Sequence, residues 1–151
     1  MKENKTNILA SIKGAKVDDE VIKLACTVAK SMKSKVYVAY VIEVERSLPL
    51  DAEIEAEIKR GEELLNRAER IAEEQDCEVE ADLLQAREAG PALVDEAIER
   101  GVSVIVIGTE YKKQFGEFSL GETILHVLKN APCRVLVCRE PISLQNEVVS
   151  Q

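Results

Sequence analysis

Residues Val102 to Glu140 read VSVIVIGTEYKKQFGEFSLGETILHVLKNAPCRVLVCRE, and this run contains the pattern of a strand, a helix and a second strand. Its first segment is apolar and β-branched, which is typical of a strand buried on both faces. Pro132 ends the helix, because a proline cannot continue it. In order, the run predicts a central strand, a polar loop, a helix and a last strand at Ser103–Gly108, Thr109–Phe118, Leu120–Asn130 and Cys133–Cys138.

The same alternation extends back to the N-terminus. Asn7 to Lys13 (NILASIK) predicts a strand closed by Gly14, and Asp18 or Asp19 is suited to cap a helix that runs to about Met32. Further strands are predicted at Lys35–Val44 and Cys77–Gln85, and further helices at Asp51–Gln75 and from Gly90-Pro91 to Arg100.

Five predicted strands alternate with four predicted helices. Right-handed βαβ units of this kind give an α/β fold, an open five-stranded parallel sheet with helices on both faces. Ligands bind such sheets beyond the carboxyl ends of the strands, where the strand order reverses. If the first and fourth strands are neighbours, Ile12, Lys13 and the residues from Gly108 onward border that site. We expect one domain, residues 1–151, with residues 141–151 as a C-terminal tail.

Composition argues against several classes of partner. The formal net charge is −8, and an acidic surface repels phosphate backbones, so neither nucleic acid nor an anionic membrane is expected. The N-terminal MKENKTNILASIKG is too polar for a signal peptide, and no segment approaches the ~20 apolar residues of a membrane helix. We therefore expect a cytoplasmic protein that does not insert into a membrane.

The cysteines and the single histidine form no recognisable metal or catalytic motif. Cys26, Cys77, Cys133 and Cys138 make no C-x-x-C pair, and His126 has no second imidazole with which to share a metal. Cys133 and Cys138 have odd spacing on a strand, which points them to opposite faces. We interpret all four as reduced thiols and His126 as a helix-surface residue, and we expect no enzyme activity.

The C-terminal run resembles the universal stress protein family, of the UspA-like kind. Ala131-Pro132-Cys133 followed by RVLVCRE is similar to the family's last segment, and ILASIKG and VYVAYVIEV are similar to its first two strands. The resemblance covers nearly the whole chain. It implies a Rossmann-like fold of the universal-stress/adenine-nucleotide alpha-hydrolase-like group, with strand order 3-2-1-4-5, and a role in stress response.

ATP-binding members of this family carry an aspartate at the end of the first strand and a G-x-x-G, nine residues, G-[ST] signature after the fourth. Gly108 and Gly121 match the first and last glycines with the family's spacing. Lys13 replaces the aspartate, Tyr111 the middle glycine and Glu122 the hydroxyl residue. Glycines let backbone amides approach phosphate, and a carboxylate at the helix N-terminus repels it. We therefore interpret the ATP-binding motif as degenerate.

The resemblance implies a nucleotide pocket at these positions, either retained or vestigial, with Val41 where the family makes backbone contacts with adenine. The implied set is Ile12, Lys13, Val41, Gly108, Thr109, Tyr111, Gly121 and Glu122. We hypothesise that Lys13 and Glu122 form an ion pair that fills the vacated site. Glu122 also completes an S-x-x-E capping box that begins at Ser119, and this gives it a competing structural role.

Three functions follow from these observations. The leading hypothesis is a non-catalytic, dimeric regulatory module that binds no cofactor tightly. The second is a sensor of ATP or AMP, because backbone donors survive many substitutions. The third is a cytoplasmic regulatory domain related to those fused to membrane transporters. The resemblance implies a homodimer through the last strand, Cys133 to Cys138, whose apolar edge would otherwise be open to unwanted pairing. A further protein partner is not predicted.

Overall fold

The computed structural model describes residues 6–111, 113–114 and 117–142, and most of the predicted tail, 143–151, lies outside them. The strands and helices occur in the predicted order. Their bounds are β1 Asn7–Ile12, α1 Asp18–Met32, β2 Lys35–Glu43, α2 Glu55–Glu74, β3 Val79–Ala86, α3 Ala89–Glu99, β4 Val102–Thr109, β5 Lys113–Gln114, β6 Glu117–Phe118, α4 Glu122–Asn130 and β7 Arg134–Arg139.

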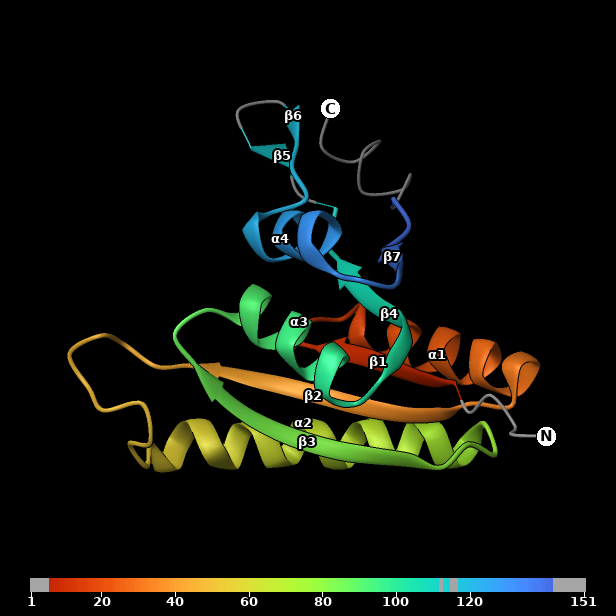
Figure 1. Cartoon of the computed structure of the whole chain (residues 1–151), viewed down its shortest axis with the longest axis horizontal. Coiled ribbons are helices and arrows are strands. Elements are labelled where there is room, and N and C mark those ends of the chain that lie inside the picture. The colour runs from red at the N-terminus through yellow and green to blue at the C-terminus, as the bar shows by residue number, and fades with distance from the viewer. Residues whose placement is uncertain (1–5, 112, 115–116, 143–151) are drawn as a thin grey trace, which may run out of the picture.

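Five strands form one parallel sheet in the order β3-β2-β1-β4-β7. This confirms the predicted order 3-2-1-4-5, in which β7 is the fifth strand. Figure 1 shows the sequence of strands from β7 through β4, β1 and β2 to β3. Strand order reverses between β1 and β4, so the carboxyl ends of these two strands mark the place where an α/β sheet binds ligands.

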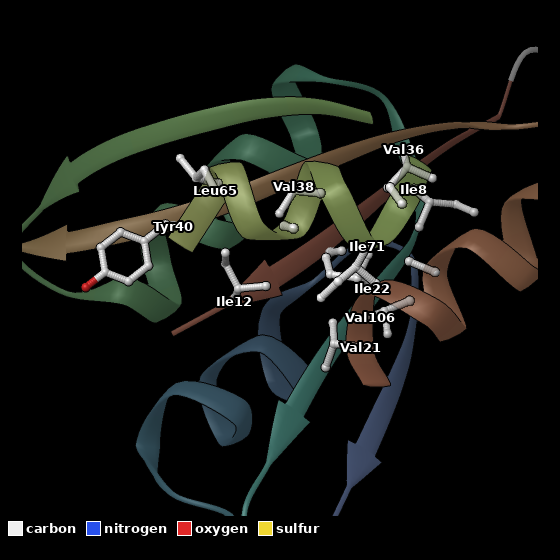
Figure 2. Packing of buried hydrophobic residues seen from close by; sticks show 14 of the residues in the cluster. Ile8, Ile12, Val21, Ile22, Val36, Val38, Tyr40, Leu65, Ile71 and Val106 are labelled. Atoms are coloured by element: carbon white, nitrogen blue, oxygen red, sulfur yellow. The ribbon is translucent and has the colours of Figure 1, made fainter. Parts of the chain in front are cut away.

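Side chains alternate between two buried layers, one on each face of the sheet. Ile8, Ala10 and Ile12 of β1 pack in the layer with α1 and α2. Figure 2 shows Ile8 and Ile12 in this layer. Leu9 of the same strand packs in the layer with α3 and α4. Such alternation follows from the two-residue period of a strand, and helices on both faces explain why the central strands β1, β2 and β4 are mostly apolar.

Helix α1 does not begin with the predicted aspartate cap, and that prediction was wrong. Val17 occupies the cap position, and Asp18 and Asp19 lie in the first helical turn. The Asp18 carboxylate instead accepts backbone N–H bonds from the loop that precedes the helix, from Lys13 at 3.1 Å and Gly14 at 2.7 Å. The loop between β1 and α1 therefore folds around a buried carboxylate.

Two other boundaries differ from the predictions. Helix α2 begins at Glu55 rather than near Asp51, because the Ala52 N–H donates to the Pro49 carbonyl in a turn before it. The segment Thr109–Phe118 was predicted as a loop, yet it contains the antiparallel pair β5 and β6. Two-residue strands carry too little periodicity to be predicted from sequence. In Figure 1 this pair projects away from the sheet.

Candidate functional site

A cavity of about 400 Å³ lies at the carboxyl ends of β1, β2 and β4. Its volume is in the range of small-molecule sites. Apolar side chains supply much of its wall, and the first turn of α4 closes one side. The lining residues are Ser11, Ile12, Lys13, Tyr40, Val41, Glu43, Glu57, Ala89, Leu93, Ile107, Gly108, Leu120, Gly121, Glu122, Thr123 and Ile124.

The structure brings together six of the eight residues expected at a nucleotide pocket. They come from three strand ends and from the start of α4: Ile12, Lys13, Val41, Gly108, Gly121 and Glu122. The segments that hold them are far apart in sequence, and the parallel pairing of β1 with both β2 and β4 places their carboxyl ends side by side.

Thr109 and Tyr111 lie outside this lining. Thr109 is buried, and its hydroxyl donates to the Glu110 carbonyl at 3.3 Å. The Tyr111 ring stacks on Phe118 with centroids 5.5 Å apart, and the Arg139 guanidinium lies 5.2 Å from the Tyr111 ring centre. Although Tyr111 stands at the position of the middle glycine of the family signature, its ring stacks on Phe118 and does not line the cavity.

The predicted ion pair between Lys13 and Glu122 is not formed. Both residues line the cavity, but the ion pairs of the described residues join other partners. Lys13 and Glu122 thus border the cavity with no salt bridge between the ammonium group and the carboxylate.

The predicted capping box at Ser119 is also wrong. Helix α4 begins at Glu122, and Gly121 is its cap residue with φ of 83°. Ser119 lies two residues before this cap position, and its hydroxyl accepts a bond from the Gly121 N–H at 3.3 Å. The first turn of α4 receives no hydrogen bond from a side-chain cap. Its backbone N–H groups remain the natural anion donors of this site.

Two acidic residues of the cavity were missed by the sequence analysis. Glu43 ends β2, and one of its carboxylate oxygens accepts a bond from the Ala89 N–H at 3.0 Å, at the start of α3. Glu57 comes from the first turn of α2. The position of Glu43 at a strand end was a usable signal. Glu57 gave none, because it resembles the other charged residues of an exposed helix.

Gly108 has a packing role that its place in the signature did not indicate. A Cβ at this position would lie 2.7 Å from Cγ2 of Val21 and 2.8 Å from Cγ1 of Val17. The glycine therefore lets α1 pack closely against β4. At Gly121 a Cβ would meet nothing within 4 Å, but its positive φ favours glycine.

His126 is not a simple surface residue. A Cβ on Gly90 would stand 2.9 Å from the His126 Cβ, so this histidine packs where α3 and α4 meet. The Asn130 side-chain amide donates to the His126 carbonyl at 2.9 Å.

Comparison with known proteins assigns the chain to a family. A family model described as the universal stress protein family matches residues 5–139. The chain belongs to this family. A relative described as universal stress protein MJ0531, from Methanocaldococcus jannaschii, is 31% identical over 134 residues, which are 85% of this chain and 78% of the relative.

Solved structures agree on the universal stress protein fold. A universal stress protein from Archaeoglobus fulgidus superposes with a TM-score of 0.74 at 23% identity, over 89% of this chain and 98% of that one. A structure of an Archaeoglobus fulgidus universal stress protein in complex with dAMP gives 0.70 at 22% identity, over 88% and 96% of the two chains.

Within residues 6–111, 113–114 and 117–142, no helix is long and apolar enough to span a membrane. In the same part of the chain, no three or more His, Cys, Asp or Glu side chains are grouped as a metal ion would require.

Proposed function

We propose that this universal stress protein is a non-catalytic, dimeric regulatory module whose cavity does not bind ATP tightly. The observation that carries the proposal is the charge of the cavity wall, where three carboxylates face one ammonium group: Glu43, Glu57, Glu122 and Lys13. A phosphate chain adds several negative charges to this wall. Each carboxylate–phosphate contact costs on the order of a few kcal/mol at an effective dielectric constant near 20.

Glu122 has the largest expected effect on an anion. It is the first residue of α4, where its carboxylate stabilises the positive end of the helix dipole. The same carboxylate competes with phosphate for the uncapped first turn. Lys13 is not paired with Glu122 and is available to a phosphate, but one ammonium group offsets only part of the repulsion from three carboxylates.

A second candidate function, an ATP or AMP sensor, is supported by two observations. The first turn of α4 has no side-chain cap, and it borders a cavity of suitable volume. The Archaeoglobus fulgidus structure with a similar fold holds dAMP. ATP or AMP would lie against the apolar walls with its phosphates at the α4 N-terminus, if backbone donors outweigh the carboxylates.

Calorimetry with ATP and AMP separates the two functions. We expect no binding by the wild type below ~1 mM and micromolar binding by Glu57→Gln/Glu122→Ser, because this variant removes two of the three carboxylates of the cavity wall and keeps Lys13. The matched control is Glu62→Gln/Glu74→Ser, which makes the same charge changes at exposed positions outside the cavity lining. Micromolar binding by the wild type would overturn the proposal in favour of the sensor. No binding by Glu57→Gln/Glu122→Ser would show that charge is not what excludes nucleotide.

The dimer is proposed to form by antiparallel pairing of two β7 strands. β7 is an edge of the sheet, and Leu136 in its middle is 38% exposed. A second copy would cover this edge and satisfy its unpaired backbone groups. In sedimentation at micromolar concentration we expect a wild-type dimer, a monomeric Leu136→Arg variant, and a dimeric Leu48→Arg control, since Leu48 is similarly exposed at 39% but lies outside the sheet. A monomeric wild type would contradict the dimer.

A further inference from the structure

A groove of about 480 Å³ lies between α3, the end of β3 and the loop after β2. It shares no lining residue with the cavity at the strand ends, and its volume is also in the range of small-molecule sites. We call it the α3 groove. Its apolar lining is supplied by Leu50, Leu84, Ala86, Pro91 and Ala92.

Hydrogen bonds from the end of β3 hold the loop wall of the α3 groove in place. Arg87, just after β3, donates through Nη1 to the carbonyls of Glu45 at 2.6 Å and Leu48 at 2.9 Å. The Gln85 side-chain amide donates to the Leu50 carbonyl at 3.1 Å. Figure 1 shows the loop after β2 and the connection from β3 to α3 at the same end of the sheet. The groove is therefore formed without a ligand, and the Arg87 guanidinium is engaged by loop carbonyls.

One face of α3 carries four carboxylates into the lining of the groove. They recur at helical spacing, opposite the face that packs on the sheet, and they are Glu88, Asp95, Glu96 and Glu99. Arg46 and the engaged Arg87 are the basic residues of the lining. Within the described part of the chain, no ion pair includes Glu88, Asp95 or Glu99. The lining is therefore negative on balance and attracts cations.

Glu96 gives the groove a carboxylate that the protein itself does not satisfy. Its side chain is 7% exposed, and its Oε2 atom is buried without a hydrogen-bond partner. The Arg100 guanidinium lies 3.8 Å from the other Glu96 oxygen, but it is bound at 3.1 Å to Asp82. Burial and the Asp82 carboxylate raise the pKa of Glu96 to about 7. A positive charge in the groove would stabilise the ionised carboxylate, because charges interact more strongly where water is excluded.

The spacing of the exposed carboxylates indicates the shape of the cation. At 1.5 Å per residue, Glu88 and Asp95 lie about 10 Å apart along the helix, and Asp95 and Glu99 about 6 Å. These distances are too long for one metal ion, and no group of metal-ligating side chains was found among the described residues. Between the carboxylates, Pro91 and Ala92 offer apolar surface on which methylene groups can lie. The lining thus suits separated positive charges on a thin apolar chain.

We propose that the α3 groove binds an aliphatic polyamine, a chain of ammonium groups joined by short methylene spacers. Asp95 and Glu99 bind ammonium groups directly, and the methylene groups lie against Pro91, Ala92 and Leu84. Glu96 adds its charge from the buried side of the same helix face.

Two other acidic places on the molecule lack this combination. The cavity at the strand ends contains Lys13, whose ammonium group repels a polyamine. A depression of about 620 Å³ near the end of α2 is lined by acidic residues that include Glu69 and Glu73, but both of these are exposed. Neither place holds a buried carboxylate oxygen without a partner among the described residues.

Calorimetry of the full chain with spermidine, at pH 7.5 and low ionic strength, tests the proposal. We expect the wild type to bind at a single site and Asp95→Asn/Glu99→Gln to bind about tenfold more weakly, because two ion pairs with the ligand are lost. The matched control is Glu69→Gln/Glu73→Gln, which removes two exposed carboxylates at the same spacing on α2 and should stay within about twofold of the wild type.

A pH series separates the buried carboxylate from the exposed ones. The wild-type affinity for spermidine should rise about fourfold from pH 6 to pH 7.5, because Glu96 is ionised over this range. The charged groups around Glu96 are Asp82 of β3 and Glu99 and Arg100 at the end of α3, with Tyr37 of β2 beside Arg100. In Glu96→Gln the affinity should be the same at both pH values.

Four outcomes would each overturn the proposal. The first is no spermidine binding by the wild type at millimolar concentration, and the second is an equal loss of affinity in Asp95→Asn/Glu99→Gln and its control. The third is loss of spermidine binding in Glu57→Gln/Glu122→Ser, which would place the ligand in the cavity at the strand ends. The fourth is a wild-type affinity that does not change with pH.

Discussion

Among the residues that the structure describes, each face of the sheet buries one carboxylate, and the two are held in different ways. On the α1 and α2 face, Asp18 accepts backbone N–H bonds from Lys13, Gly14 and Ala15. On the α3 and α4 face, Glu96 is 6% exposed, and its Oε2 atom is buried with no hydrogen-bond partner. The comparison shows that burial alone does not make a carboxylate structural, because the donors around it decide whether its removal costs or gains stability.

The electrostatic surroundings of Glu96 explain its position. The Arg100 guanidinium contacts both carboxylate oxygens of Asp82 at 3.1 Å, but it lies 3.8 Å from the nearer Glu96 oxygen. Arg100 also lies 4.7 Å from the ring centre of Tyr37. Burial and the neighbouring Asp82 carboxylate raise the pKa of Glu96 to about 7, against a smaller opposing effect of Arg100.

Asp18→Ala is expected to have the largest effect on this comparison. It removes the acceptor of three backbone donors in the loop before α1, and we expect the free energy of unfolding to fall by about 3 kcal/mol. Urea denaturation measures it. The control is Asp19→Ala, whose partner Arg67 lies on the surface, and which should change the midpoint much less. Equal losses in the two variants would remove the special role of Asp18.

Gly108→Ala is expected to destabilise the α1 and α2 face by about 2 kcal/mol, because the added methyl group overlaps Val21 and Val17. Thermal and urea unfolding measure the loss. A second substitution, Val21→Ala, removes the atom nearest to the new methyl group, so the two changes should be less than additive. Full additivity would show that the glycine is needed for another reason.

Glu96→Gln is expected to have the smallest effect and the opposite sign. The pKa of Glu96 is raised from 4.5 in the unfolded chain to about 7 in the folded one, so the folded state holds the proton more tightly. Its contribution to stability is therefore fully present below pH 4.5 and is lost as the pH rises to about 7. At pH 8 the uncharged glutamine should stabilise the protein by ~1–2 kcal/mol, with little change at pH 4.5.

The measurement is urea unfolding of wild type and Glu96→Gln at both pH values. The control is Glu62→Gln, which changes the same charge on the exposed side of α2. A stability difference that does not depend on pH would assign the Glu96 effect to packing rather than to its charge.

The sequence predicted the order of elements because most strands, β4 above all, are rich in β-branched residues and the helices carry an apolar stripe. The sequence did not predict the hydrogen bonds of short polar side chains that have several backbone groups within reach. Asp18 and Ser119 were both expected to cap a helix. Instead, Asp18 accepts a hydrogen bond from the Gly14 N–H in the loop before α1, and Ser119 accepts one from the Gly121 N–H. Local competition of this kind depends on the backbone path, which the residue types alone do not reveal.

The candidate site was likewise only partly predictable from the sequence. The family spacing from Gly108 to Gly121 located both glycines at the cavity, since parallel strand ends must meet there. The family signature identified Tyr111 at the position of the middle glycine, but it did not show that the Tyr111 ring lies outside the cavity lining. The ring contacts Phe118 and Arg139 instead.

By itself, the sequence determined the alternation of strands and helices and so a layered α/β fold, because periodicity acts over short stretches of chain, whereas the strand order followed from the resemblance to the family. Only the tertiary structure decided that Glu43 and Glu57 join the cavity wall and that Lys13 and Glu122 form no ion pair with each other. These contacts join residues distant in sequence, and their distances depend on how helices pack on the sheet rather than on any local preference.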